Sequence, residues 1–142
     1  NSELEHVEIG SLDFALFYPS NAKIKSDDEA ILLSHFPLAI MEGTGNYQSF
    51  LGELPAKHGI IIRKSVSCSS FPMMAKTLKI LDIAAVLPEI AREELASTEF
   101  EMRKLNSLEK LKRELCICWN KRRAKMNPTL HEFGHSLSKL TK

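Results

Sequence analysis

The feature that most constrains the fold is a series of short apolar runs separated by segments with helical spacing. Residues 12–18 and 83–87 are almost continuously apolar, and residues 60–66 are expected to form a β-branched strand. Runs of this length without polar alternation are typical of strands that are covered on both faces of a sheet. Because helical patterns separate these strands, the sequence predicts an α/β fold with largely parallel sheets.

A first helix is expected at the start of the chain. Ser2 and Glu5 have the spacing of a capping box, in which each side chain binds the backbone N–H of the other residue. Leu4 and Val7 would then share one face, and Gly10 is placed to end the helix. These local signals predict a helix that leads into the first strand.

Three longer helices are expected downstream. The first follows a glycine-rich turn and is closed by Pro55, and the second is capped by Ser70. The third begins at Asn127 and Pro128 and runs to Leu140. The apolar residues expected to face the core are Tyr47, Phe50, Leu51 and Leu54 in the first helix, Met74, Leu78 and Leu81 in the second, and Leu130, Phe133, Leu137 and Leu140 in the third.

Further strands are expected at residues 38–41, 100–105 and 113–119, and a short helix is expected to start at Pro88. The segment 19–28 is polar and rich in turn residues, so it is expected to be a loop. With 142 residues, the chain is long enough for one domain or two small lobes.

The composition is that of a folded protein with no strong charge bias. Apolar residues make up 44% and charged residues 26% of the chain, and the formal net charge is +1, so nothing in the balance demands nucleic acid or an acidic membrane. No apolar run approaches the ~20 residues that a membrane span needs. The three cysteines form no zinc-like pairing, which favours buried thiols in a reduced compartment. These observations predict a cytoplasmic protein without a membrane segment.

Several segments together resemble one known family. Gly10-Ser11-Leu12-Asp13 and the strand after it are similar to a helix–Gly-x-Leu-Asp–strand segment of the effector-binding domain of LysR-type transcription regulators. Later segments resemble the same domain in their order and spacing, so the resemblance covers most of the chain. These segments are 32–40, 74–88, 114–118 and 127–133.

The resemblance implies a two-lobed fold like that of type 2 periplasmic binding proteins, with a ligand cleft between the lobes. Residues 1–30 and 112–142 would form an incomplete first lobe, and residues 31–111 would form the second lobe. The implied function is the sensing of a small effector molecule by a bacterial regulator that binds DNA as a homo-oligomer. We expect DNA binding only through a module that this chain lacks. We expect no enzymatic activity and no cofactor.

The residues expected to hold a ligand lie at helix starts. A helix N-terminus presents unpaired N–H groups and about half a positive charge, which favours a carboxylate or another anion. In an open α/β sheet these starts lie at the carboxyl ends of strands, where ligands bind. The alternative is that each hydroxyl merely caps its own helix. The candidate ligand-binding residues are Ser2, Thr44, Gly45, Ser67, Ser69 and Ser70.

A rival motif lies near the end of the chain. His131, Glu132 and His135 fit the H-E-x-x-H pattern of zinc peptidases, in which two histidines hold the metal and the glutamate acts as general base. The motif makes a zinc-dependent hydrolase the alternative function. Against it, Ser138 and Thr141 occupy positions where an extended pattern has glycine and histidine.

Helical geometry also separates the two histidines from the apolar stripe of their helix by nearly half a turn. We therefore expect His131 and His135 to face solvent and to form no metal centre, although incidental metal binding by the pair stays open.

Overall fold

The computed structural model describes residues 3–140 and divides the chain into two compact units. Asn1–Leu12 and Arg113–Lys142 form one unit, here named the terminal unit, and Asp13–Lys112 form the other, named the central unit. Within residues 3–140 no helix is long and apolar enough to cross a membrane.

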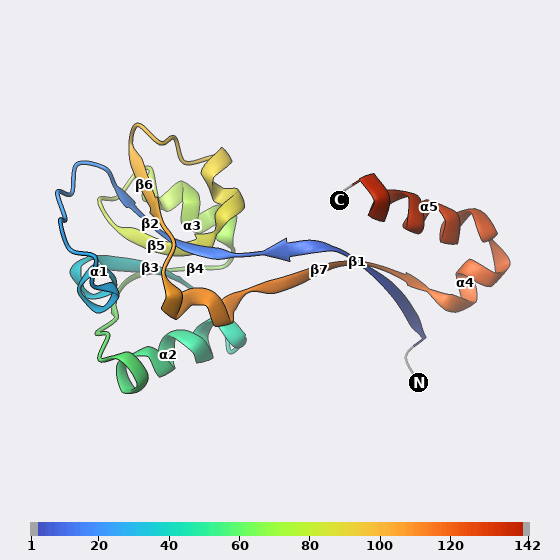
Figure 1. The fold of residues 1–142 in the computed structure, drawn as a ribbon, viewed down its shortest axis with the longest axis horizontal. Helices are drawn as coiled ribbons and strands as arrows, with labels where there is room; N and C mark the ends of the chain where they lie inside the picture. Colours follow the sequence, from blue (N-terminus) through green and yellow to red (C-terminus); the bar gives the residue numbers. More distant parts are fainter. Residues whose placement is uncertain (1–2, 141–142) are drawn as a thin grey trace. The chain divides into compact units, whose positions relative to one another are not determined.

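The central unit is built on a five-stranded mixed sheet with strand order β4-β3-β5-β2-β6 (Figure 1). Strand β3 is parallel to both β4 and β5, whereas β2 is antiparallel to β5 and to β6. The expected α/β class is thus correct, but the expectation of largely parallel sheets is wrong, because two of the four pairings in this sheet are antiparallel. The strands are β2 (Phe14–Pro19), β3 (Pro37–Met41), β4 (Arg63–Cys68), β5 (Ala84–Pro88) and β6 (Phe100–Arg103).

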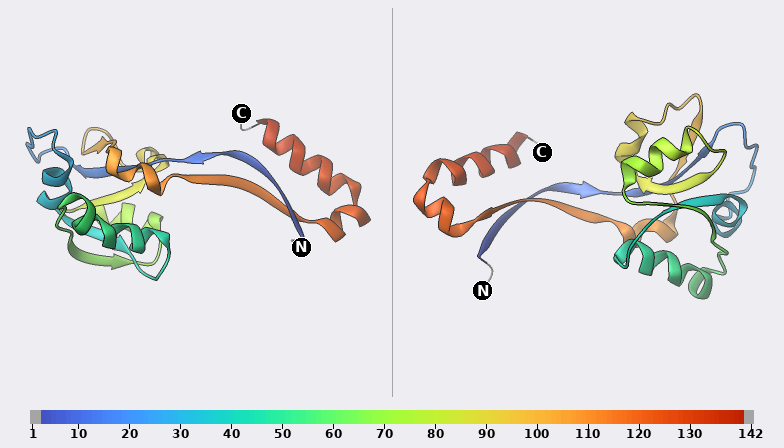
Figure 2. Two further views of the ribbon diagram at one scale, coloured as in Figure 1. Left: turned by 60° about the horizontal axis from the view of Figure 1, so that its bottom comes forward. Right: turned by 180° about the vertical axis from the view of Figure 1, so that it is seen from behind.

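Every residue of β2 and β5 is buried, because helices cover both faces of the sheet (Figures 1 and 2). Leu16, Val86 and Leu87 are completely shielded from solvent. The apolar runs at 12–18 and 83–87 therefore mark the buried strands of the core, as expected, whereas the run at 60–66 leads into an edge strand that is mostly exposed. The helices are α1 (Glu29–His35), α2 (Asn46–His58) and α3 (Phe71–Leu78), with the 3-10 helices η1 (Glu89–Glu93) and η2 (Asn106–Leu111).

Two details of these helices differ from the expectation. Helix α2 continues through Pro55 to His58 and ends at Gly59, whose φ of 64° is the left-handed conformation that favours glycine. Proline removes only its own N–H, and the Pro55 carbonyl still accepts from the Gly59 N–H at 3.1 Å. In the second predicted helix, Leu81 lies beyond the end of α3 and is exposed, since the helix stops at Leu78.

The terminal unit contains a two-stranded antiparallel ribbon and two helices. Strand β1 (Leu4–Leu12) pairs with β7 (Arg113–Asn120), and α4 (Lys121–Met126) and α5 (Pro128–Leu140) follow (Figure 1). The prediction of a helix at the start of the chain is wrong: pairing from Leu4 to Leu12 with β7 overrides the local capping signal. Ser2, the proposed cap, lies outside the described residues.

Helix α5 packs by the face opposite to the expected one. Gly134 and Ser138 are buried, whereas Phe133 is 60% and Leu140 81% exposed. Gly134 allows this packing because a glycine lets the helix backbone approach the Trp119 ring of β7. The expectation that the apolar stripe faces the core is therefore wrong for this helix.

The boundaries between the two compact units follow Leu12 and Lys112. Strand β2 pairs with β5 and β6, so the segment 13–30 belongs with the central unit. Whether the two units correspond to the two lobes named above stays a prediction.

Candidate ligand-binding site

The parallel strands β3, β4 and β5 end at one edge of the central sheet, here named the carboxyl edge. Met41 and Cys68 are register partners at the ends of β3 and β4, and the Glu42 N–H donates to the Cys68 carbonyl at 2.8 Å. This bond holds the loop after β3 beside the turn after β4. Four of the candidate residues are thus brought to the same edge, namely Thr44, Gly45, Ser69 and Ser70.

The start of α2 has no side-chain cap. Gly45 occupies the N-cap position and forms no side-chain hydrogen bond, and Thr44 before it is exposed. Gly43 has a φ of 111°, a conformation that other residues rarely adopt, so the loop needs glycine there. The N–H groups of the first turn of α2 therefore have no side-chain acceptor at the N-cap, which is the arrangement that suits an external anion.

Gln48 holds this loop in place, a role that the sequence analysis missed. Its Nε2 donates to the Met41 carbonyl and, at 2.6 Å, to the Glu42 carbonyl. The amide thereby ties the first turn of α2 to the end of β3. A glutamine three positions after the N-cap is the only sequence signal, and it is also a common surface residue of helices.

The start of α3 differs from that of α2 because the hydroxyl of its N-cap residue already accepts a hydrogen bond from the helix backbone. Ser70 is the N-cap, and its Oγ accepts from the Met73 N–H at 3.3 Å. Ser70 therefore caps its own helix, and its contribution to ligand binding stays a prediction. Ser67 and Ser69 are both exposed and lie on either side of the buried Cys68.

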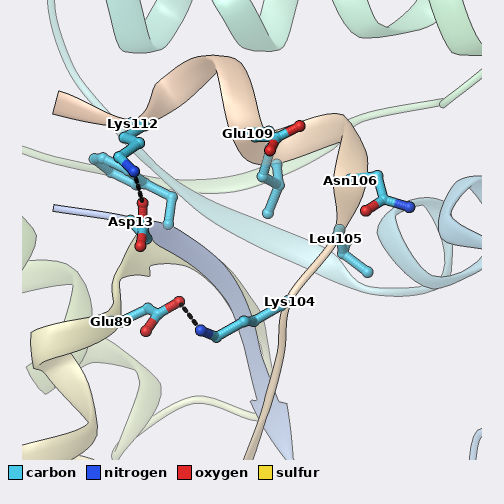
Figure 3. A pocket seen from close by; sticks show the side chains of 9 residues that line it. Asp13, Glu89, Lys104, Leu105, Asn106, Glu109 and Lys112 are labelled. Carbon is cyan, nitrogen blue, oxygen red and sulfur yellow. Dashed lines mark ion pairs between the residues drawn. The ribbon is translucent and has the colours of Figure 1, made fainter. Parts of the chain in front are cut away.

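A pocket of about 250 Å³ opens on the half of this edge formed by β5, β2 and β6 (Figure 3). Register places Phe14, at the start of β2, opposite Pro88 at the end of β5, and the Glu89 N–H donates to the Asp13 carbonyl at 2.8 Å. The sequence analysis missed this pocket. It is lined by Asp13, Phe14, Glu89, Lys104, Leu105, Asn106, Leu108, Glu109 and Lys112.

The charges in the pocket are paired with one another. Lys104 Nζ lies 3.0 Å from Glu89 Oε1, and Lys112 Nζ lies 3.7 Å from Asp13 Oδ1 (Figure 3). Each lysine is thus partly neutralised by a carboxylate. An anion would therefore bind more favourably at the helix N-termini than at these lysines, which are already paired with carboxylates.

An aromatic cluster connects the pocket to the two helix starts. Phe14 lies with its ring centroid 6.4 Å from that of Tyr47 and 5.6 Å from that of Phe71, and Tyr47 and Phe71 are 5.5 Å apart. The Tyr47 hydroxyl donates to the Val86 carbonyl at 3.0 Å, and burial raises the pKa of Tyr47, so it stays a neutral donor. One aromatic cluster, here named the aromatic floor, therefore lies under both halves of the carboxyl edge.

The residues of the rival motif lie elsewhere, in the terminal unit. His131 and His135 project from α5 onto Trp119, with ring centroids 5.6 and 5.4 Å from the indole, while the His131 side chain stays 46% exposed. Both histidines are therefore exposed, as expected, and their rings also contact the indole. Among residues 3–140, no group of three or more His, Cys, Asp or Glu side chains is arranged to hold a metal ion.

Comparison with known proteins gives likenesses in structure alone. No family model matches the sequence, and no curated protein matches it. Among solved structures, the regulatory domain of MexT, a transcriptional activator in Pseudomonas aeruginosa, matches with a TM-score of 0.71 at 15% identity over 97% of this chain and 68% of that one. The regulatory domain of CcmR from Synechocystis PCC6803, in complex with 2-PG, gives 0.70 at 13% identity over 96% and 67%.

The LysR family transcriptional regulator CbnR matches with a TM-score of 0.60 at 15% identity over 85% of this chain, and the chain spans only 43% of its length. The chain therefore has the fold of the regulatory domains of LysR-family regulators. This is the fold that the segments from Gly10 onward predicted, the two-lobed class related to periplasmic binding proteins, and the chain spans 67% and 68% of the lengths of the CcmR and MexT domains.

Proposed function

We propose that this chain is an effector-sensing regulatory domain of a LysR-type transcription regulator and that it binds a small anion at the carboxyl edge. The observation that carries the proposal is the pairing of β3 with β4, which sets the uncapped start of α2 beside the start of α3. The likeness to the CcmR regulatory domain, solved in complex with 2-PG, supports a ligand-binding role for this fold.

The anion is received mainly by the first turn of α2. Its N–H groups donate from the backbone, where Gly43 and Gly45 leave room for a close approach, and the Thr44 hydroxyl supplies a side-chain donor. Ser67 and Ser69 add hydroxyls from the neighbouring strand and turn. Ser70 contributes through the helix that it caps, and Ser2, outside the described residues, stays a candidate from the sequence alone.

No step of chemistry is assigned to the site. Binding acts by shifting a conformational equilibrium, since a ligand that prefers one arrangement of a protein raises the population of that arrangement.

The zinc hydrolase alternative has no support, because the histidines of its motif lie against Trp119 and no third ligand is assembled within residues 3–140. We therefore propose a sensor without catalytic residues, cofactor or catalytic metal.

The remaining parts of the proposal come from the likeness to whole regulators. Full-length CbnR is solved in complex with its target DNA. The full protein would likewise bind DNA, through a separate module, in the cytoplasm and as a homo-oligomer. This chain would influence the DNA-bound homo-oligomer only by binding the effector.

A thermal-shift screen of small carboxylates and phosphate-bearing acids tests the proposal. An anion that raises the melting temperature of the wild-type protein should raise it measurably less in Thr44→Val, which lacks the side-chain donor. The matched control is Thr98→Val, because Thr98 is an exposed threonine near the opposite edge of the same sheet, where Ser20 donates to its carbonyl. Equal losses in both variants, or an unchanged shift in Thr44→Val, would contradict binding at the carboxyl edge.

A further inference from the structure

Two histidines on α5 already point their nitrogen atoms at each other. His131 and His135 are one helical turn apart, and their Nε2 atoms are 3.2 Å apart. Both rings are hydrogen-bonding groups on the same face of the helix, with centroids 4.4 Å apart. A carboxylate also lies close to the pair, because Glu5 of β1 has its Oε2 3.9 Å from His131 Nε2.

The surroundings fix this pair in place. Gly134, between the two histidines, lies against the Trp119 ring, and both imidazoles meet the indole edge-on. The indole Nε1 donates to Glu5 Oε2 at 2.8 Å, which fixes the carboxylate on the same face of the ribbon. Less side-chain freedom is therefore lost when a ligand binds these groups than at an ordinary surface pair of histidines.

We propose that His131 and His135 bind a divalent transition metal ion such as Ni²⁺, Cu²⁺ or Zn²⁺ through their Nε2 atoms. Neutral imidazole is a preferred ligand for these ions. With metal–nitrogen bonds of about 2.0–2.1 Å, two nitrogen atoms 3.2 Å apart subtend an angle of about 100° at the metal. That angle lies between those of ideal octahedral and tetrahedral sites, so the pair needs little rearrangement.

The site is a two-histidine site completed by water, and it is not catalytic. Glu5 is not counted as a third metal ligand, because its Oε2 accepts a hydrogen bond from Trp119 Nε1. No set of three metal ligands is assembled within residues 3–140. The metal takes the place of the hydrogen bond between the two Nε2 atoms, so that each neutral ring carries its one proton on Nδ1, and it holds the turn of α5 between residues 131 and 135 in its helical form. Binding should therefore stabilise the packing of α5 on the ribbon.

A competing site must be separated from this one. Cys116 and Cys118 are exposed on β7, and His6 is the cross-strand partner of Cys118. Successive residues of a strand point to opposite faces, so these side chains lie on the other face of the ribbon from Trp119. Thiolates also bind Ni²⁺, Cu²⁺ and Zn²⁺, and the experiment must tell the two faces apart.

The single tryptophan of the chain supplies the readout. Bound Ni²⁺ at the histidine pair lies next to the Trp119 indole and should quench its fluorescence, and EDTA should restore it. The experiment uses the 142-residue chain without a histidine tag, stripped of metal and then titrated with Ni²⁺. We expect His131→Ala and His135→Ala each to raise the apparent Kd at least ten-fold, and Cys118→Ser and His58→Ala to leave it within two-fold.

Quenching that persists in both histidine variants, or that disappears in Cys118→Ser, would overturn the proposal. A second measurement needs no variant and so does not depend on their folding. In the imidazole NMR spectrum of the wild-type protein, Zn²⁺ should shift the Nε2 resonances of two of the five histidines, those of His131 and His135. Shifts confined to other histidines, or no shifts, would also overturn it.

Discussion

Gly134 lies so close to Trp119 that a Cβ atom at position 134 would stand 2.7 Å from Cζ3 of the indole. Real Cβ atoms do not approach other heavy atoms to this distance. The absence of a side chain at one residue of α5 is therefore what lets the helix pack on β7, and it determines which face of α5 is buried.

Gly134→Ala should destabilise the terminal unit although alanine is the better helix former. The helix would gain about 1 kcal/mol in propensity, but either the indole or the helix must move, and overpacking of this kind costs about 1–3 kcal/mol. Because Trp119 also holds Glu5, its displacement disturbs a hydrogen bond as well. Chemical denaturation followed by Trp119 fluorescence should show a lower midpoint.

Phe133→Ala is the matched control for that variant. Phe133 is adjacent on the same helix but 60% exposed, so its truncation should change the free energy of unfolding by less than about 0.5 kcal/mol. A larger loss of stability in Phe133→Ala than in Gly134→Ala would contradict the packing of Gly134 on Trp119. It would mean that α5 packs by its apolar stripe, as the sequence pattern predicted.

Gln48→Glu should loosen the loop at the carboxyl edge without changing the shape of the side chain. A carboxylate cannot donate to the Met41 and Glu42 carbonyls, so both hydrogen bonds of the amide are lost. We expect a loss of about 1–2 kcal/mol in the free energy of unfolding and faster amide exchange in residues 42–46. Ser49→Ala, at an exposed neighbouring position, should do neither; equal exchange in the two variants would show that Gln48 does not hold the loop.

Glu29 should make the stability of the central unit depend on acid pH. Burial alone would raise the pKa of this carboxyl group, but hydrogen bonds from Ser107 and Asn106 outweigh it and hold the pKa below its usual value. A lowered folded-state pKa means that the stabilisation is fully present above the unfolded-state pKa and is lost as pH falls through the folded-state value.

The comparison of wild type with Glu29→Gln isolates this contribution. At pH 7 the wild type should be more stable by about 1–2 kcal/mol, a value reduced for partial exposure. The difference should shrink as the pH falls below about 4, the ordinary range of a glutamate pKa. Urea denaturation at a series of pH values measures it, and a difference independent of pH would refute the role of the carboxylate.

The sequence predicted the central unit well because its signals are local. The apolar runs around Leu16 and Val86 are buried strands, and Ser70 caps a helix as its position indicated. The glycine pair around Thr44 likewise marked the start of α2. Each of these features is decided by residues within one or two turns of the chain.

The errors arose where distant residues decide the outcome. The ladder between β1 and β7, which lie at opposite ends of the chain, turned the expected first helix into a strand. The burial of Gly134 depends on Trp119, and no helical pattern contains that information. The pocket was missed for the same reason, because Asp13, Glu89 and Lys104 come from three separate segments.

Phe14→Leu should separate the stability of the carboxyl edge from its ligand binding. Phe14 is only 5% exposed and contacts both Tyr47 at the start of α2 and Phe71 at the start of α3. Leucine keeps an apolar side chain there but is smaller, so we expect a loss of about 1–2 kcal/mol in the free energy of unfolding from the space left behind. Because the aromatic floor sets both helix starts, the melting-temperature shift from an anion should fall in this variant as well. Phe100→Leu, at a buried phenylalanine of β6 opposite Pro19, should cost similar stability and leave the anion shift unchanged.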